Sequence, residues 1–548
     1  MRKLWLAWLV VSLGCASAPI KPPDLAELDK ADALVLQGCY DCLLEARDIY
    51  ARVGVAKARP FVVSRIFEAE LLIALREKEL AIDPAPSLAR AKAISTELPP
   101  SLEAARYLTL AEAIPADEVG VARSEDTDFR RARAAFLPTI DDEIAWLRSP
   151  TAEPATPAGG RGAAAPAATR GAKPGVPVIP MRLGQQVREY LALSVDCTYA
   201  ARPRRAGQPP RPVGAPAVPA GAPPLVMYRT GICRGVTAAS LEKVRAIVPR
   251  FVETSYFLGR MGVRDASNTG GAKAKEQLTE AYKRFPKSSS ITYMNGNINQ
   301  LVGDCRAAQR FYEETLAMRP LHENGWLGQT VCLTYLKRTD EAIASATRMI
   351  ELKLPNTSEA YYWRGWNHYF IRKDLPAARS DTDSAKKIAF TMSISTLAGI
   401  VENEQDDLDL AEKDLVSARS MQDGHRNCIA AWHLGLVYMK RKDWLKSGDT
   451  FEAAMRCYTD NVTEAQLGLA FIEKRDDLEP EFKARQIANF QASMIEDRAQ
   501  ACAAAFNAAN YYATGGNVGK AKTLVEVAAR DTSLADKVAA LRDWLKDK

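Results

Sequence analysis

The stretch SSITYMNGNINQLVGDCRAAQRFYEETLAMRP, residues 289–320, contains the pattern that decides the fold. Its first half has the apolar spacing of a helix, with Gly296 where a neighbouring helix can approach closely. Gly303 begins a turn. A second helix follows, with small and bulky residues spaced by four: Ala308, Tyr312 and Leu316. Pro320 prevents that helix from continuing. The stretch therefore predicts a helical hairpin.

The same pattern recurs every 34 to 37 residues. Prolines close the helical segments: Pro249, Pro286 and Pro320. Glycines occupy the equivalent place in the helix that follows: Gly259, Gly296, Gly365, Gly399 and Gly435. A period of this length indicates stacked helical hairpins, since each hairpin needs a neighbour to bury its apolar face. Such a stack favours binding over catalysis.

The unit that follows residue 428 carries the clearest repeat. Its residues include Trp432, Leu434, Gly435, Tyr438, Phe451 and Ala454. This pattern resembles the tetratricopeptide repeat family of helical-hairpin solenoids, and the resemblance extends over roughly 225–545, about seven or eight units. It implies an all-α tetratricopeptide-type superhelix in residues 225–548, ending in a cap helix over 536–546.

The rest of the chain divides by composition. Residues 15–148 have helical spacing and predict N-terminal helical hairpins of the same general type. Residues 149–182 are rich in Ala, Pro and Gly and predict a disordered linker, because they contain too few large apolar residues to offset the entropy of ordering. Residues 183–224 predict one helix followed by a Pro-rich loop.

The N-terminus predicts a targeting segment. Arg2 and Lys3 precede a short apolar run, so we expect residues 1–14 to be a signal peptide. Leu13-Gly14-Cys15 resembles the lipobox of bacterial lipoproteins, which implies lipidation of Cys15 with palmitate or similar chains; simple secretion with cleavage after Ala18 is the alternative. Two or more acyl chains anchor a protein stably. We therefore expect a lipid-anchored protein of the bacterial cell envelope, on the outer membrane and facing the periplasm.

Ten cysteines suit an oxidising compartment. We predict three disulfides: Cys39 with Cys42, Cys197 with Cys233, and Cys428 with Cys457. Redox catalysis or metal binding by Cys39 and Cys42 is the alternative, although no second cysteine pair has zinc spacing. Cys305 and Cys332 form a weaker candidate pair, and Cys502 is left over.

Neither composition nor motifs indicate catalysis. A net charge of +6 over 548 residues gives no case for nucleic-acid binding. The four histidines have no ligand spacing, and the paired glycines lack the Lys and Ser or Thr of a phosphate-binding loop. We therefore expect no catalytic residues, metal or cofactor; an enzyme that uses the N-terminal cysteines is a rival hypothesis.

The resemblance also implies a binding face. In tetratricopeptide arrays, residues around the conserved glycine line the concave surface. The equivalent positions here are Tyr256, Arg260, Tyr293, Asn297, Gln300, Tyr362, Trp366, Tyr369, Asn403 and Trp432. Tyr362, Trp366 and Tyr369 share one helix face and predict an aromatic stripe. Packing between repeats is the alternative role for these rings.

Aromatic rings with amide neighbours suit a peptide, because rings give contact area at low entropy cost and amides can bond a peptide backbone. We therefore predict a non-enzymatic, membrane-anchored scaffold that binds a protein or peptide partner in the cell envelope. The alternative function is a lipoprotein that binds a solute or glycan on the same aromatic face.

Overall fold

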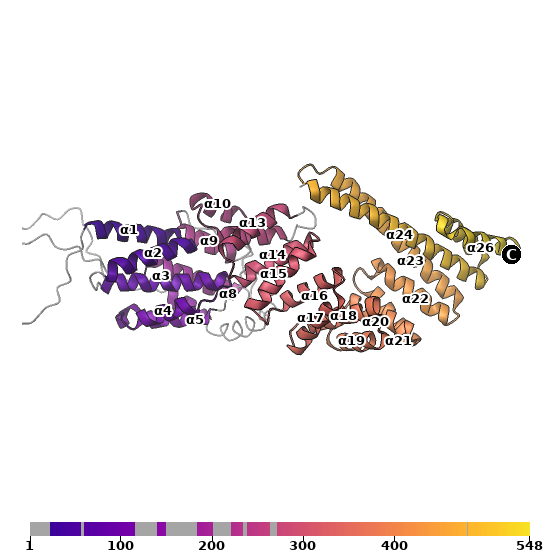
Figure 1. Ribbon diagram of the computed structural model, residues 1–548, viewed down its shortest axis with the longest axis horizontal. Coiled ribbons are helices and arrows are strands. Elements are labelled where there is room, and N and C mark those ends of the chain that lie inside the picture. Colours follow the sequence, from indigo (N-terminus) through magenta and orange to yellow (C-terminus); the bar gives the residue numbers. More distant parts are fainter. Residues whose placement is uncertain are drawn as a thin grey trace, which may run out of the picture. The chain divides into compact units, whose positions relative to one another are not determined.

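The computed structural model describes residues 22–55, 60–114, 140–148, 184–200, 221–233, 238–263, 271–478 and 480–548. Within these ranges the chain forms 24 α-helices and no strand. Neighbouring helices pair as hairpins, as Figure 1 shows. The predicted all-α, tetratricopeptide-type solenoid is confirmed. The predictions on residues 1–21, 149–182 and 201–220 lie outside the described residues.

The described residues form two compact units. One contains those up to Met261 together with Glu280–Ile291, and the other contains Gly262–Thr279 and Thr292–Lys548. The first unit is built from α1 (Pro22–Gln37), α2 (Tyr40–Val55), α3 (Pro60–Glu79), α4 (Ala85–Ser95), α5 (Ala104–Ala113), α7 (Ile140–Arg148), α8 (Gln185–Ala200), α9 (Pro224–Cys233), α10 (Ala238–Ile247) and most of α11 (Glu253–Val263). Thus α9, α10 and most of α11, which the sequence assigned to the superhelix, are grouped with the N-terminal helices.

The remaining helices follow in sequence order. They are α13 (Ala272–Arg284), α14 (Ser289–Leu301), α15 (Cys305–Met318), α16 (Glu323–Tyr335), α17 (Thr339–Glu351), α18 (Thr357–Trp366), α19 (Leu375–Ile388), α20 (Met392–Glu404), α21 (Leu408–Ser420), α22 (Cys428–Lys440), α23 (Trp444–Glu473), α24 (Pro480–Thr514), α25 (Val518–Ala528) and α26 (Ala535–Lys546). In the turn between α14 and α15, Gly303 adopts a φ of 84°, which a residue without Cβ tolerates best. The Asp304 side chain then accepts a hydrogen bond from the Ala307 amide and caps α15.

The repeated glycines permit close helix contact. A Cβ added at Gly435 would lie 2.7 Å from the ring of Phe451, which is fully buried, and one added at Gly399 would lie 2.6 Å from Leu415. Each of these glycines therefore lets a bulky residue of the following helix pack against the backbone. This contact explains why the glycines recur with the repeat period.

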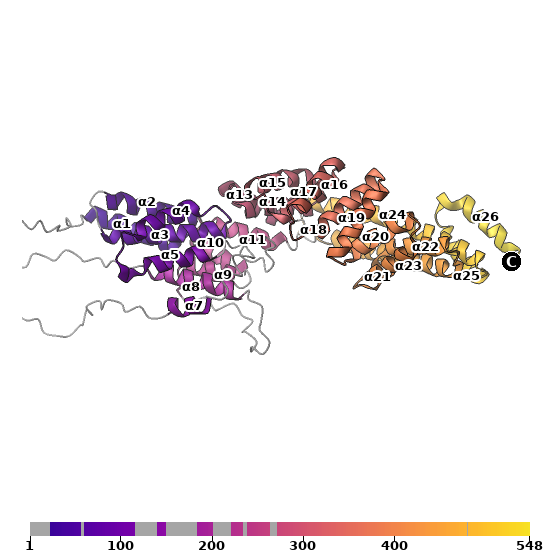
Figure 2. The ribbon, with the colours of Figure 1, turned by 90° about the horizontal axis from the view of Figure 1, so that it is seen from below.

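Two helices depart from the repeat length. The second unit is otherwise made of helices of 10 to 14 residues, whereas α23 has 30 and α24 has 35. They pack side by side in both views (Figures 1 and 2). At the C-terminus α26 buries Val538, Leu541 and Leu545 in the same hydrophobic cluster as α24 and α25 residues. In the part of the chain that the structure describes, no helix is long and apolar enough to cross a membrane.

A buried group of charges lies inside the first unit. Arg76 and Arg229 are 0 % and 1 % exposed, and their partners Glu79 and Glu253 are 3 % and 1 % exposed. Arg76 pairs with Glu79, and its Nη2 lies 2.6 Å from Oε1 of Glu253. Nη1 of Arg229 lies 2.7 Å from Oε1 of Glu79. Two buried cations and two buried anions therefore offset one another's charge, and they join α3, α9 and α11.

Candidate functional site

Six aromatic side chains gather on the α16 and α18 hairpins of the second unit. They are Tyr335, Tyr362, Trp363, Trp366, Tyr369 and Phe370, and we refer to them as the aromatic cluster. Tyr335 is 68 % exposed and Phe370 is 37 % exposed, whereas the other four rings are half-buried. The cluster therefore presents ring surface to solvent while being anchored in the protein.

The rings form a continuous chain of contacts. Ring centroids lie 6.3 Å apart between Tyr335 and Trp363, 6.2 Å between Trp363 and Trp366, and 4.9 Å between Trp366 and Phe370. Tyr369 meets Phe370 edge-on at 4.7 Å. These separations and angles are the ones that aromatic pairs favour. The rings therefore hold one another in place.

The predicted stripe makes up the inner side of this cluster. Tyr362, Trp366 and Tyr369 pack together against Ala378, Leu397 and Val401 of the following helices. These three rings therefore contribute to packing between repeats, and the half-buried state leaves part of each ring accessible. The more exposed rings, Tyr335 and Phe370, together with Trp363, were not predicted from sequence.

The helix that carries the cluster changes its pitch in the middle. Directly after α18, Asn367–Arg372 form a π-helical segment, η3, which ends at Lys373 with a φ of 56°. A π-helical turn holds an extra residue, and such segments are frequent at functional sites. The turn places Tyr369 and Phe370 beside Trp366.

Asn367 fixes this turn to the preceding hairpin. Its side chain is fully buried, and Nδ2 donates to Oγ1 of Thr334 and to the carbonyl of Trp363, both at 2.8 Å. Thr334 is adjacent in sequence to Tyr335. The amide therefore helps to set the position of Tyr335 against Trp363.

A second polar group supports the same helix from the other side. Arg364 makes a two-pronged ion pair with Asp381 of α19, with Nε to Oδ2 at 2.9 Å and Nη2 to Oδ1 at 2.6 Å. Burial lowers the pKa of the nearby His368 imidazole, although Asp381 partly opposes this shift. Burial and the Glu404 carboxylate raise the pKa of Tyr369 to about 12. His368 and Tyr369 are therefore uncharged at neutral pH, and the aromatic surface carries no charge of its own from these groups.

The other predicted binding residues lie in several environments. Tyr256 is 2 % exposed and packs on Phe257 in the first unit, so it is a core residue there, and Arg260 is half-buried. Asn403 is 1 % exposed and thus lies inside the array. Trp432 packs edge-on against Phe451 at 5.3 Å.

Three more predicted residues lie on α14. The Tyr293 ring contacts the rings of Tyr312 and His322 at tilted angles and is half-buried. Gln300 accepts a hydrogen bond from the Tyr312 hydroxyl at 2.6 Å, and Asn297 is half-buried. Of the ten predicted residues, Tyr362, Trp366 and Tyr369 lie together in the aromatic cluster, and each of their rings is partly exposed to solvent.

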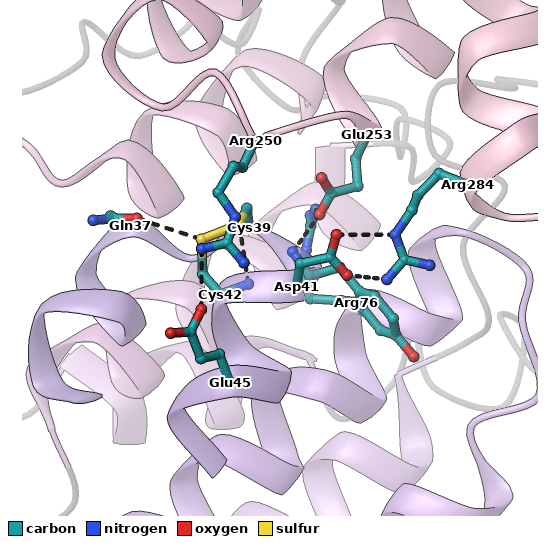
Figure 3. Close-up of a disulfide and its surroundings, with 10 residues drawn as sticks. Gln37, Cys39, Asp41, Cys42, Glu45, Arg76, Arg250, Glu253 and Arg284 are labelled. Atoms are coloured by element: carbon teal, nitrogen blue, oxygen red, sulfur yellow. Dashed lines mark hydrogen bonds and ion pairs between the residues drawn. A yellow bond between two sulfur atoms is a disulfide. The ribbon is translucent and has the colours of Figure 1, made fainter. Parts of the chain in front are cut away.

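Disulfides join two of the predicted cysteine pairs, Cys39–Cys42 and Cys428–Cys457. Figure 3 shows the first of them at the start of α2, where Arg284 pairs with Asp41 and Arg250 pairs with Glu45. Both Cys39 and Cys42 are 0 % exposed, so this turn lacks the accessible thiolate that redox catalysis uses. The side chains of Cys197 and Cys233, and the whole of Cys15, lie outside the described residues.

The second unit also contains a polar cavity of about 340 Å³ beside α23. Its lining residues are His425, Asp449, Glu452, Ala453, Arg456, Cys457, Asp460 and Lys520. Nζ of Lys520 lies 3.1 Å from a carboxylate oxygen of Asp449 and of Glu452, so these three charged side chains form ion pairs with one another. None of the ten predicted binding residues lines this cavity. Among the described residues, no group of three or more His, Cys, Asp or Glu side chains has the arrangement of a metal site.

Comparison with known proteins gives a match to one family model. Residues 230–388 match the model of the Iml2/Tetratricopeptide repeat protein 39 family, a segment that includes the aromatic cluster. The curated proteins include none that matches this chain significantly.

Many solved structures are similar at low identity. The Cut9–Hcn1 hetero-tetramer of the APC/C is 12 % identical over 96 % of both chains, with a TM-score of 0.38. Yeast Tom70 is 12 % identical over 96 % of this chain and 95 % of its own, with a TM-score of 0.31. PilW, a type IV pilus biogenesis factor, is 18 % identical over 43 % of this chain and 98 % of its own, with a TM-score of 0.29.

Similarity at this level says nothing about function. The paired helices are of the tetratricopeptide type, and residues 230–388 are similar to this family model.

Proposed function

We propose that this protein is a non-enzymatic scaffold of the bacterial cell envelope, tethered by lipid on Cys15, and that its aromatic cluster binds an extended segment of a partner protein. The observation that carries the proposal is the aromatic cluster itself. Its six contiguous rings include the 68 % exposed Tyr335 and the 37 % exposed Phe370. Large aromatic side chains dominate the energetics of protein interfaces.

The rigidity of the cluster supports binding of a flexible ligand. Contacts with Ala378, Leu397 and Val401 hold the inner rings, and Asn367 holds the turn. A receptor surface that is already ordered loses little conformational entropy when it binds, so more of the contact energy appears as affinity. An extended peptide could then lay apolar side chains between Tyr335, Trp363 and Phe370.

The lipid anchor is proposed from the sequence alone. Leu13-Gly14-Cys15 resembles a lipobox, and the apolar run before it is short. Replacement of Cys15 by Ala should move the protein from the membrane fraction to the soluble fraction of fractionated cells. Membrane association that persists in Cys15→Ala would contradict the anchor without affecting the scaffold proposal.

Site-specific crosslinking tests the scaffold. A photo-crosslinking amino acid at Phe370 should join the protein to a specific partner segment in intact cells, identified by mass spectrometry. The same crosslinker at Leu467, which is 68 % exposed on α23, is the matched control and should not capture that segment.

A binding measurement with the identified segment completes the test. The double variant Tyr335→Ser/Phe370→Ser should weaken binding at least tenfold and leave helical content unchanged, because these rings are the most exposed of the cluster. Unchanged affinity would refute the proposed binding face. Saturable binding of a sugar or small solute at the same rings, with no peptide binding, would instead support a solute-binding lipoprotein.

A further inference from the structure

Two cysteines outside the observed disulfides lie almost within bonding distance. Cys305 is the first residue of α15, and Cys332 lies in the last turn of α16. Their sulfur atoms are 2.6 Å apart, with Cys332 donating to Cys305. This separation is roughly 0.6 Å longer than the S–S bond of a disulfide. A small movement of either side chain would therefore allow a covalent bond.

The two sulfurs differ in accessibility. Cys305 is 9 % exposed, whereas Cys332 is 0 % exposed. Burial and the Asp304 carboxylate raise the pKa of both thiols, but the hydrogen bond from Cys332 opposes the shift at Cys305. Cys305 also lies at the N-terminus of a helix, a position that stabilises a thiolate. Cys305 is therefore the better nucleophile and the first to meet a reagent.

We propose that Cys305 and Cys332 form a reversible dithiol–disulfide pair that crosslinks two successive hairpins. The oxidant is a small organic disulfide. The Cys305 thiolate attacks one of its sulfurs and breaks its S–S bond, and the released thiolate takes up a proton. The Cys332 thiolate then attacks Sγ of Cys305, breaks the mixed disulfide, and releases the second thiol. Two electrons pass from the cysteine pair to the oxidant, and the two thiol protons end on its products.

The bond would join helices of different repeats. α14 and α15 form one hairpin, in which Gly296 lies against Tyr312, and α16 and α17 form the next. Cys305 and Cys332 share a buried cluster with Ala308 and Tyr312, so the crosslink would lie in the interface between these hairpins. Oxidation would therefore restrict changes in the angle between neighbouring repeats. This inference does not depend on the proposed partner binding.

Peptide mapping of the purified full chain tests the proposal. The protein is incubated at pH 8 with oxidised glutathione, denatured, alkylated and digested with trypsin. Most of the peptide that contains Cys305 should be joined to the peptide that contains Cys332, and dithiothreitol should reverse the link. Recovery of both cysteines in alkylated form, without the link, would overturn the proposal.

Single variants test the order of attack. Cys332→Ser should trap one glutathionyl group on Cys305, at least ten times faster than Cys305→Ser acquires one on Cys332. Faster modification of Cys332 would contradict the assigned nucleophile. Cys502→Ser is the matched control, because it removes another buried thiol and should leave the linked peptide unchanged. Loss of the link in Cys502→Ser would show that the proposed pairing is wrong.

Discussion

The Asn367 side-chain amide lies 2.8 Å from Oγ1 of Thr334, and this hydrogen bond helps to connect the π-helical turn to the preceding hairpin. Both residues are buried, and the Thr334 hydroxyl in turn donates to the carbonyl of Thr330 at 2.9 Å. The aromatic cluster therefore depends on a polar contact beneath it. The buried hydrogen bonds of Asn367 help to fix the positions of the rings at the surface.

Replacement of Thr334 by Val should destabilise the protein by about 1 to 2 kcal/mol, because the buried Asn367 amide loses one of its two hydrogen-bond acceptors. Urea unfolding followed by circular dichroism would measure the change. The variant should also weaken partner binding, since Tyr335 and Trp363 lose their fixed spacing. Thr523→Val, at an exposed position on α25, is the control and should change the free energy of unfolding by less than about 0.5 kcal/mol.

Trp366 and Phe370 should behave differently although their rings are in contact. Trp366 packs on the buried cluster, so Trp366→Ala should cost about 2 to 4 kcal/mol of stability. Phe370→Ala should cost less than about 1 kcal/mol, because the ring is 37 % exposed. Thermal unfolding of both variants would measure the two stability losses and show which ring is part of the packed interior. Equal losses would contradict the division into inner and outer rings.

Gly435 and Gly519 offer a matched pair of substitutions to Ala. At Gly435 the new methyl group would press on the buried Phe451 ring, so we expect a loss of about 1 to 3 kcal/mol. At Gly519, in α25, no atom lies within 4 Å of the added Cβ, and Ala should stabilise the helix by about 0.5 to 1 kcal/mol. Chemical unfolding of both variants would measure whether the free energy of unfolding decreases in Gly435→Ala and increases in Gly519→Ala. A neutral Gly435→Ala would refute the close-approach explanation of the repeat.

His433 should make stability depend on pH. Burial lowers its pKa from 6.5 to about 4 in the folded protein. As the pH falls from about 6.5 to 4, the unfolded chain binds the proton first, so the free energy of unfolding decreases. The total effect is about 2 to 3 kcal/mol. His433→Gln should remove this contribution to the pH dependence. The variant should then lose less stability between pH 7 and 4 than the unaltered protein does. Identical pH profiles of the two proteins would contradict the role given to His433.

The repeated hairpins could be predicted because close helix packing imposes glycine at fixed intervals, as at Gly435 against Phe451. The aromatic stripe was predictable for the same reason, since its rings are counted from Gly365. The π-helical turn was not predictable, because it ends its helix at Arg372, and no later turn follows in which the shift in apolar spacing could be seen. Tyr335 belongs to a different repeat and reaches the cluster only through the fold.

The buried charges of the first unit were equally invisible in the sequence. Arg76 and Glu79 lie in a charged run that is typical of a solvated helix end. Their partners Arg229 and Glu253 lie more than 140 residues further along the chain, beyond two Pro-rich segments. Only the three-dimensional packing brings the four together.

The long-range ion pairs also determine how this molecule can be dissected. A fragment that ended at residue 148 would retain the guanidinium of Arg76 but lose Glu253, its acidic neighbour from α11. In such a fragment the Arg76 guanidinium would lack a partner that it has in the intact protein, where it is fully buried, at a cost of several kcal/mol of stability. The shortest N-terminal fragment expected to fold independently therefore extends to Ile291, where Arg284 and Ser288 still reach Asp41 and Leu80.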